Sequence, residues 1–323
     1  MTEVEVVAEV VRSGFVEGRH WGAVVALAAD GSVEWAIGDV ESPILPRSCN
    51  KPIQVLALLR AGWEPRRSEQ LALACASHSA EEMHLEIVRE ILADAGLDES
   101  ALQTPADWPL DEGVKEQVIR AGGEKSSVLM NCSGKHAAKL ATCVANGWDT
   151  ATYLDPDHPL QRVIAETFAE LTGEPVAATA VDGCGAPLLS TSLTGLARAF
   201  GRLATATDGQ ERQIAEAIRA HPELISGTQR DERALLAAIP GAIGKGGAEA
   251  CHALALPDGR AWALKIEDGG GRARPVVLAA ALERSGVLVE SGVDADAVRE
   301  TGCSLLHGGG AVVGEIRPRV TDS

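Results

Sequence analysis

Short, valine-rich stretches in which apolar and polar residues alternate lie near both ends of the chain. Alternation with a period of two is the pattern of a half-buried β-strand. The predicted strands are residues 4–11, 22–28 and 33–38 near the N-terminus, and 251–256, 260–266 and 311–320 near the C-terminus. Asp30-Gly31 and Pro257-Asp258-Gly259 separate two neighbouring pairs and favour tight hairpin turns.

The middle of the chain carries apolar residues at helical spacing, and Gly62, Gly96 and Gly147 end three of these runs. We expect Ser68 to cap one helix and Ser79 to open the next in a capping box with Glu82. The predicted helices are residues 52–61, 68–76, 80–95, 135–146, 160–171, 209–220 and 231–238, with a further helix over 275–285.

Strands at both ends around a helical middle predict an α+β fold. The sheet would be built from residues of about 1–50 and 241–323, and the helical part, about 51–240, would pack beside it. No repeat, low-complexity tract or linker interrupts the chain, so we expect a single domain over residues 1–323.

The composition and charge of the chain limit the classes of function and partner that we expect. The chain has 46 acidic against 29 basic residues, a formal charge of −17, which disfavours nucleic-acid and anionic-membrane partners. It starts without a basic, apolar leader and has no long apolar run, so we expect a cytoplasmic protein with reduced cysteines. Only seven of the 29 basic residues are lysines, at positions 51, 115, 125, 135, 139, 245 and 265. This sparing use suggests that the chain keeps lysine where an amine is needed.

Ser48 and Lys51 form a Ser-x-x-Lys pattern. On a first helical turn the two side chains share one face, and a neutral lysine amine can accept the serine proton. Pro52 complicates this geometry because a proline disfavours helical angles at the residue before it. The alternative is a helix-capping Ser48 beside a solvated Lys51.

Four other segments could carry chemistry. Ser79 could be a second active-site serine or only a helix start. Cys132 and Cys184, with a nearby nitrogen, could bind a soft metal such as zinc, although the chain has no Cys-x-x-Cys. A glycine-rich stretch at 244–251 could bind an anion or a carboxylate through its backbone, with Lys265 on the following strand, or could be a plain loop.

Taken in order, these blocks resemble the rhizobial-type, class 3 L-asparaginases, the asparaginase II family. The blocks are Ser48-Cys-Asn-Lys51-Pro, Ser77-His-Ser79, Asn131-Cys-Ser-Gly-Lys-His136, Asp182-Gly-Cys-Gly185, the loop from Gly246-Gly247 to Cys251, and Lys265. The resemblance runs from about residue 10 to 313. It implies a fold similar to serine β-lactamases and penicillin-binding proteins, and hydrolysis of L-asparagine to L-aspartate and ammonia through an acyl-enzyme.

The resemblance also implies roles for individual residues. Ser48 would be the nucleophile and Lys51 its base, with Ser79 and Lys265 assisting proton transfer. One zinc ion per chain would be bound by Cys132, Lys135 and Cys184, and two chains would form a homodimer. The substrate would be contacted by Asp182, His78, Asn131, Gly246, Gly247 and Cys251. Ala80 and Ala250 depart from the family pattern, which has glycine at both positions.

Three alternatives stay open. A peptidase or β-lactam hydrolase could use the same Ser–Lys pair, although the chain lacks the Ser-Asp-Asn and Lys-Thr-Gly blocks of those enzymes. Cys132 could be the nucleophile with His136. The chain could also bind zinc or an amino acid without catalysis. It lacks the threonine motifs of the other asparaginase types.

Overall fold

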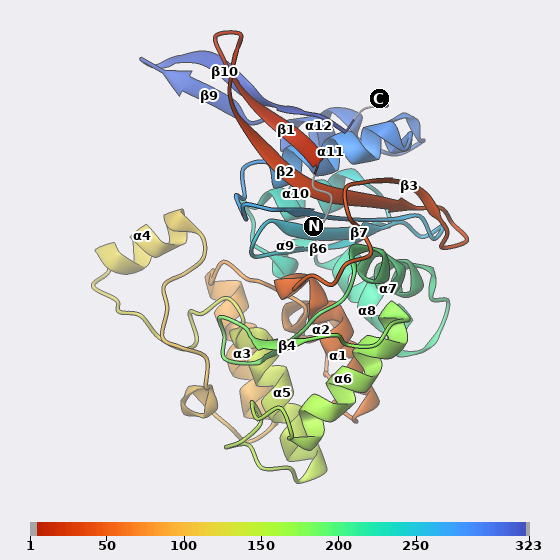
Figure 1. Cartoon of the computed structure of the whole chain (residues 1–323). Helices are drawn as coiled ribbons and strands as arrows, with labels where there is room; N and C mark the ends of the chain where they lie inside the picture. Colours follow the sequence, from red (N-terminus) through yellow and green to blue (C-terminus); the bar gives the residue numbers. More distant parts are fainter. Residues whose placement is uncertain (1–4, 321–323) are drawn as a thin grey trace. The chain divides into compact units, whose positions relative to one another are not determined.

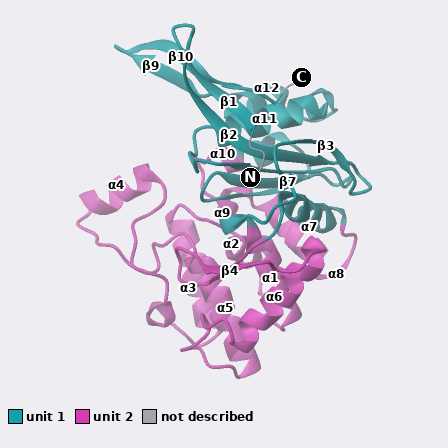
Figure 2. Ribbon diagram, viewed as in Figure 1, with its two compact units in different colours: residues 1–49, 191–205, 234–323 teal, residues 50–190, 206–233 magenta. Residues whose placement is uncertain are grey.

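The computed structural model describes residues 5–320 and divides into two compact units (Figures 1 and 2). The first unit comprises Met1–Cys49, Thr191–Thr205 and Ala234–Ser323, and the second comprises Asn50–Ser190 and Ala206–Arg233. The chain therefore passes back and forth between them. Residue 4, at the start of the first predicted strand, lies outside the described residues.

The first unit is built on an antiparallel sheet, confirming the expected α+β class with a sheet made from both ends of the chain. Within residues 5–320 the sheet has eight strands in the order β6-β7-β8-β2-β1-β10-β9, and β3 pairs with β2. Their bounds are β1 Glu5–Arg12, β2 Phe15–Leu27, β3 Val33–Ile37, β6 Ile243–Gly247, β7 Cys251–Ala255, β8 Ala261–Ile266, β9 Leu305–Gly308 and β10 Ala311–Pro318.

Both predicted hairpins form, β2–β3 and β7–β8. Strand β2 is 13 residues long and begins well before the predicted start at residue 22. Its first half pairs with β1 across the turn at Ser13 and Gly14, which have φ of 47° and 82°, and its second half pairs with β3 and β8. Strand β2 thus links the half of the sheet made of β1, β10 and β9 to the half made of β8, β7 and β6.

Helix α7 (Leu193–Thr205) falls within the predicted helical part of the chain and belongs to the unit that contains the sheet. Its buried face, with Leu196 and Phe200, packs on β2, β7 and β8. Helix α11 (Arg274–Arg284) packs on the sheet from the other side, and α12 (Ala295–Thr301) packs against α11 (Figure 1). Both faces of the sheet are therefore covered.

The second unit is mainly helical (Figure 2). Helix α1 packs against α5, α6 and α8, and α2 packs against α3, α5 and α8. A two-stranded ribbon of β4 and β5 accompanies them. The bounds are α1 Lys51–Arg60, α2 Ser68–Ala74, α3 Glu82–Asp94, α4 Glu112–Arg120, α5 Ser133–Asn146, α6 Pro159–Thr172, β4 Thr179–Val181, β5 Pro187–Leu189, α8 Gly209–Ala220 and α9 Pro222–Ile225; α10, Asp231–Ala238, spans the boundary with the first unit.

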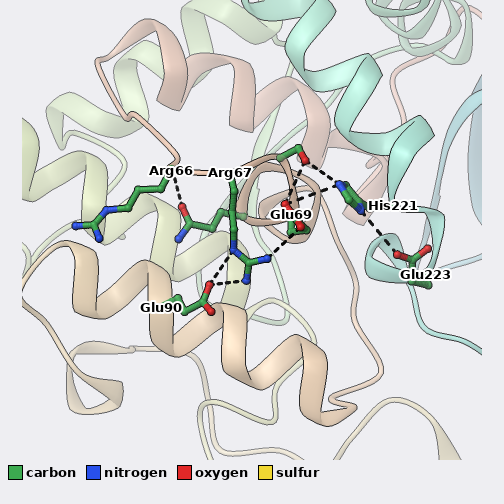
Figure 3. Close-up of polar contacts among 8 residues, drawn as sticks. Arg66, Arg67, Glu69, Glu90, His221 and Glu223 are labelled. Carbon is green, nitrogen blue, oxygen red and sulfur yellow. Dashed lines mark hydrogen bonds and ion pairs between the residues drawn. The ribbon is translucent and has the colours of Figure 1, made fainter.

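Two predicted helix caps are wrong. Helix α2 is preceded by Arg67 at its N-cap, and the Ser68 hydroxyl instead bonds with Glu69 and His221 (Figure 3). In the same network, the Arg67 guanidinium pairs with Glu90 of α3 and with Glu69 (Figure 3). The predicted serine cap is therefore absent, and the side chains at the start of α2 take part in charged and polar pairs instead.

The predicted capping box of Ser79 and Glu82 is replaced by one of Glu81 and His84 at the start of α3. The reason is the backbone at Ala80, whose φ of 59° breaks the helical path between Ser79 and the helix. A left-handed conformation is costly for a residue with a Cβ and easy for glycine. Ala250, the other departure from the family pattern, has a φ of 50°.

We expect Ala80→Gly to raise the free energy of unfolding by roughly 0.5–1 kcal/mol, because glycine removes the left-handed strain. Denaturant unfolding measures the gain. Ala93→Gly is the matched control: Ala93 is exposed within α3, so the same change should destabilise the protein by about 1 kcal/mol. A destabilised Ala80→Gly variant would contradict the assignment of strain.

Within residues 5–320, no helix combines the length and the apolar character that a membrane span requires. All seven cysteines are free thiols, and Cys303 alone among them is exposed.

Candidate functional site

The predicted site residues fall into two groups, one in each unit. The first unit holds Ser48, Gly246, Gly247, Cys251 and Lys265. The second unit holds Lys51, His78, Ser79, Asn131, Cys132, Lys135, Asp182 and Cys184.

In the first unit, Gly247, Cys251 and Lys265 form a row across β6, β7 and β8. Gly247 is the register partner of Cys251, and Cys251 is the partner of Lys265. Directly opposed residues on antiparallel strands point to the same face. The Lys265 amine donates a hydrogen bond to the Glu249 carbonyl at 3.0 Å. The thiol and this amine therefore share one face of the sheet at the β6–β7 turn.

The segment that carries Ser48 lies against β6. The Cys49 thiol donates to the Lys245 carbonyl at 3.0 Å. A Cβ added at Gly247 would lie only 2.7 Å from the Pro46 carbonyl oxygen and 3.1 Å from the Cys49 Sγ, so this contact requires glycine. Ser48 is 9% exposed. The first unit thus brings the predicted nucleophile beside the row of Gly247, Cys251 and Lys265.

Lys51 begins α1, directly after the short 3-10 helix η1 (Arg47–Asn50) that carries Ser48. Its side chain is fully buried, so the alternative of a solvated Lys51 is wrong. The amine donates to the Ala76 carbonyl oxygen and to the Ser77 Oγ, the latter at 2.9 Å. Sequence reasoning missed Ser77 as a site residue, although it begins the Ser-His-Ser block.

Ser79 is buried, and its hydroxyl donates to the Ser226 carbonyl at 2.8 Å. The next residue, Ala80, has the left-handed backbone described above. Gly227 packs on this turn so tightly that an added Cβ would lie 2.2 Å from the Ser79 Oγ. The segment around Gly227 is a second element that the sequence did not indicate, since it lies far along the chain and carries no motif.

His78 is fully buried, and its backbone N–H donates to the Asn131 carbonyl at 3.1 Å. The ring Nδ1 accepts from the Ala80 N–H, so Nε2 carries the hydrogen and donates to the Ser133 Oγ at 2.8 Å. Burial, with the charges of His84 and Lys51, lowers the pKa of His78 well below its ordinary value. The ring is therefore neutral, and both of its nitrogens are engaged within the second unit.

Cys132, Lys135 and Cys184 meet at the start of α5. The Lys135 amine lies 3.2 Å from the Cys184 Sγ, and the Asp182 carboxylate lies 3.7 Å from the same sulfur. A hydrogen bond from Cys132 lowers the pKa of Cys184, while that bond and burial raise the pKa of Cys132. Burial opposes the charge on Lys135, but the two sulfurs and Asp182 raise its pKa overall. The cluster thus brings two cysteine sulfurs and a lysine amine together in a buried environment.

This cluster offers a metal ion two sulfurs and one amine. Among the described residues, no group of three or more His, Cys, Asp and Glu side chains is arranged to hold a metal ion. Cys132 and Cys184 supply the two sulfurs, and the Lys135 amine lies 3.2 Å from the Cys184 Sγ. Sulfur and nitrogen donors suit zinc, so the residues fit such an ion once their protons have left.

The surroundings of His136 are relevant to the alternative in which Cys132 is the nucleophile and His136 its partner. Its Nδ1 lies 2.7 Å from the Tyr153 hydroxyl, and burial lowers its pKa to about 4. The hydrogen bond with Cys184 and burial raise the pKa of Cys132, and its thiol is a poor nucleophile because the thiolate is the reactive form.

Lys139 lies one helical turn beyond Lys135 on α5 and is also fully buried. Its amine has no hydrogen-bond partner among the described residues. Burial and the charge of Lys135 lower the pKa of Lys139 to about 7. Four of the seven lysines, Lys51, Lys135, Lys139 and Lys245, are at most 1% exposed, in keeping with the sparing use of lysine along the chain.

Comparison with solved structures finds distant likenesses. A structure titled Mglu in its native form shares 14% identity at a TM-score of 0.45; the match covers 85% of this chain and 66% of that one. A β-lactamase from Mycobacterium bovis shares 14% identity at 0.42, covering 81% and 94%. The Bacillus subtilis glutaminase YbgJ, in covalent complex with 5-oxo-L-norleucine, shares 13% identity at 0.40, covering 82% and 88%.

A search of curated proteins finds no significant match. The sequence model of the L-asparaginase II family, in contrast, matches residues 8–318, almost the whole chain, and the protein is therefore a member of the L-asparaginase II family of amidohydrolases.

Proposed function

We propose that this chain hydrolyses L-asparagine to L-aspartate and ammonia, with Ser48 as the nucleophile and Lys51 as its base. The observation that carries the proposal is the buried Lys51 amine, at the start of the helix that follows η1 and Ser48. A base at this position must be the neutral amine, and removal from water favours that form.

The reaction would run in two steps. The Ser48 hydroxyl attacks the side-chain amide carbon of asparagine while its proton passes to Lys51, and that proton then leaves with the amide nitrogen as ammonia. Water then cleaves the acyl-enzyme and releases aspartate. The backbone N–H groups near Ser48 and Gly247 would stabilise the oxyanion, and loss of one such donor typically costs about 3 kcal/mol.

The remaining predicted residues would hold the substrate and help to move protons. The Asp182 carboxylate would pair with the α-ammonium of asparagine, because an acidic side chain complements that charge. Ser77 extends the proton path, since the Lys51 amine already donates to its hydroxyl. Ser79 and Lys265 would assist proton transfer. The other proposed substrate contacts are His78, Asn131, Gly246, Gly247 and Cys251.

We also propose one zinc ion per chain, held by Cys132, Lys135 and Cys184. When bound, zinc would supply a fixed positive charge close to Asp182. The three side chains would release their protons to bind it, so zinc affinity should fall as the pH is lowered. The proposed assembly is a homodimer in the cytoplasm, with no nucleic-acid or membrane partner.

We expect Cys184→Ser to reduce bound zinc from about one per chain to a small fraction, because the variant loses a thiolate ligand. Metal analysis of the purified protein and a competition titration measure the stoichiometry and the affinity. Cys303→Ser is the matched control, since Cys303 is exposed and should leave both unchanged. Equal zinc content in all three proteins would refute the assignment of these ligands.

Ammonia release from purified protein tests the proposed activity. We expect turnover of L-asparagine and none of the β-lactam nitrocefin, which separates this function from a β-lactam hydrolase with the same Ser–Lys pair. Glutamine should be a poorer substrate, because one additional methylene is discriminated by roughly 1–3 kcal/mol. Binding of asparagine without ammonia release would favour the non-catalytic alternative instead.

A further inference from the structure

The turn formed by residues 226–228 packs against Ser79 within the second unit. The Ser79 hydroxyl donates to the Ser226 carbonyl at 2.8 Å, and the Ser77 N–H donates to the Ile225 carbonyl at 3.0 Å. A Cβ added at Gly227 would clash with both Ser79 and Glu81. Ile225 and the turn that follows it therefore contact Ser77, Ser79 and Glu81, every second residue of this block.

Thr228 fastens the turn to Glu81. The Thr228 N–H and its hydroxyl each donate to one carboxylate oxygen of Glu81, both at 2.8 Å. Glu81 is in turn fixed by the capping box with His84, whose Nδ1 accepts from the Glu81 N–H. Two charge-assisted hydrogen bonds to one carboxylate make a specific and comparatively strong tether.

The tether determines how Ser79 presents its hydroxyl. A carbonyl oxygen can only accept, so the Ser79 hydrogen points to Ser226 and the lone pairs of Oγ remain available as acceptors. The left-handed Ala80 beside it is a strained conformation that persists only when its surroundings hold it. Release of the turn would free the Ser79 hydroxyl to take other rotamers and other partners.

We infer that Thr228 is a positioning residue that acts through Glu81: it holds the 226–228 turn on Ser79 and keeps that hydroxyl oriented as a hydrogen-bond acceptor. The inference rests on the proposed function for its catalytic consequence, because Ser79 matters to turnover only if it assists proton transfer. The tether itself does not depend on that function.

Thr228→Val and Thr228→Ser test the inference, because valine keeps the shape of threonine without the hydroxyl and serine restores that hydroxyl. We expect Thr228→Val to lower kcat for asparagine about tenfold, a change of about 1.4 kcal/mol, with KM within about twofold. Thr228→Ser should recover most of kcat. Because Glu81 and Thr228 act as one unit, Glu81→Gln combined with Thr228→Val should cost little more than either change alone.

Thr172→Val is the matched control. It deletes another threonine hydroxyl of the same unit, one that bonds to the Phe168 carbonyl on α6, and it should leave kcat unchanged. Amide hydrogen exchange gives a readout independent of activity. We expect the Ser77 amide, which bonds across this contact, to exchange faster in Thr228→Val than in wild type or in Thr172→Val.

Unchanged exchange at Ser77 in Thr228→Val would overturn the inference, whatever the kinetics. Faster exchange with unchanged kcat would overturn the positioning role, as would a Ser79→Ala variant with full activity. If the wild type released no ammonia from asparagine, the proposed function would fall, and the exchange comparison alone would decide on the tether.

Discussion

Ser48→Ala should lower the rate of asparagine hydrolysis roughly 10³-fold or more, because the variant has no oxygen to form the acyl-enzyme. Ammonia release under saturating substrate gives kcat directly. The folded structure should survive, since only one hydroxyl is lost and the residues on either side, Pro46 and Cys49, hold this segment against β6. Thermal unfolding of both proteins checks this.

Ser190→Ala provides the matched control, since Ser190 is a buried serine, directly after β5, whose hydroxyl accepts from the Ala178 N–H directly before β4. It should keep full activity. Cys132→Ser does not separate the mechanisms by rate alone, because Cys132 is also a proposed zinc ligand. Acid-quenched mass spectrometry does: an acyl adduct on Cys132, or full activity of Ser48→Ala, would refute the serine mechanism.

Lys139→Met should stabilise the protein at neutral pH by about 2–5 kcal/mol, raising Tm by on the order of 5 °C. The wild-type amine is buried without a hydrogen-bond partner among the described residues, and its charged form is costly there. Methionine has a similar length and removes that cost. Denaturant and thermal unfolding measure the gain.

The gain should depend on pH in a definite sense. The pKa of Lys139 is about 7 when folded and 10.5 as its ordinary value, so between these pH values the unfolded chain binds the extra proton. Stability of the wild type therefore rises with pH across this window. The advantage of Lys139→Met should be largest below pH 7 and should vanish near pH 10.5.

Lys125→Met is the matched control for the stability series. Lys125 is half exposed and lies 3.6 Å from the Asp107 carboxylate, and such surface pairs contribute little. Its unfolding free energy should stay within about 0.5 kcal/mol of wild type at every pH. A gain for Lys139→Met that persists unchanged to pH 10.5 would show that the amine is not the cause.

The sequence predicted those parts of the fold that local chemistry determines. The hairpins formed where Asp30-Gly31 and Pro257-Asp258-Gly259 stood, because these residues favour the turns themselves. Helix α7 was missed because Gly195 and Gly201 lower its helix propensity, and its stability comes from packing on β2, β7 and β8. Its place beside the sheet is a tertiary property that periodicity cannot reveal.

The residues of the candidate site also divide into those with a local sequence signal and those without one. Ser48 and Lys51 were indicated by their spacing, and Cys132 and Cys184 by residue type, because these signals are local. Thr228 lies 147 residues from Glu81, with nothing in either neighbourhood to indicate the pairing. The expectation that Ser79 caps α3 failed because the left-handed backbone at Ala80 breaks the helical path, and the Ser79 hydroxyl instead donates to a carbonyl of that distant turn.

The pairing of β1 with β10 has a consequence for biosynthesis. Ala8 is the register partner of Pro318, so β1 leaves the ribosome long before its partner strand β10. At 5–20 residues per second this delay is roughly 15–60 s, during which β1 and β2 expose edges capable of pairing with other chains. The nascent protein should therefore depend on chaperones that bind its N-terminal hairpin, and a slowed translation rate should increase aggregation.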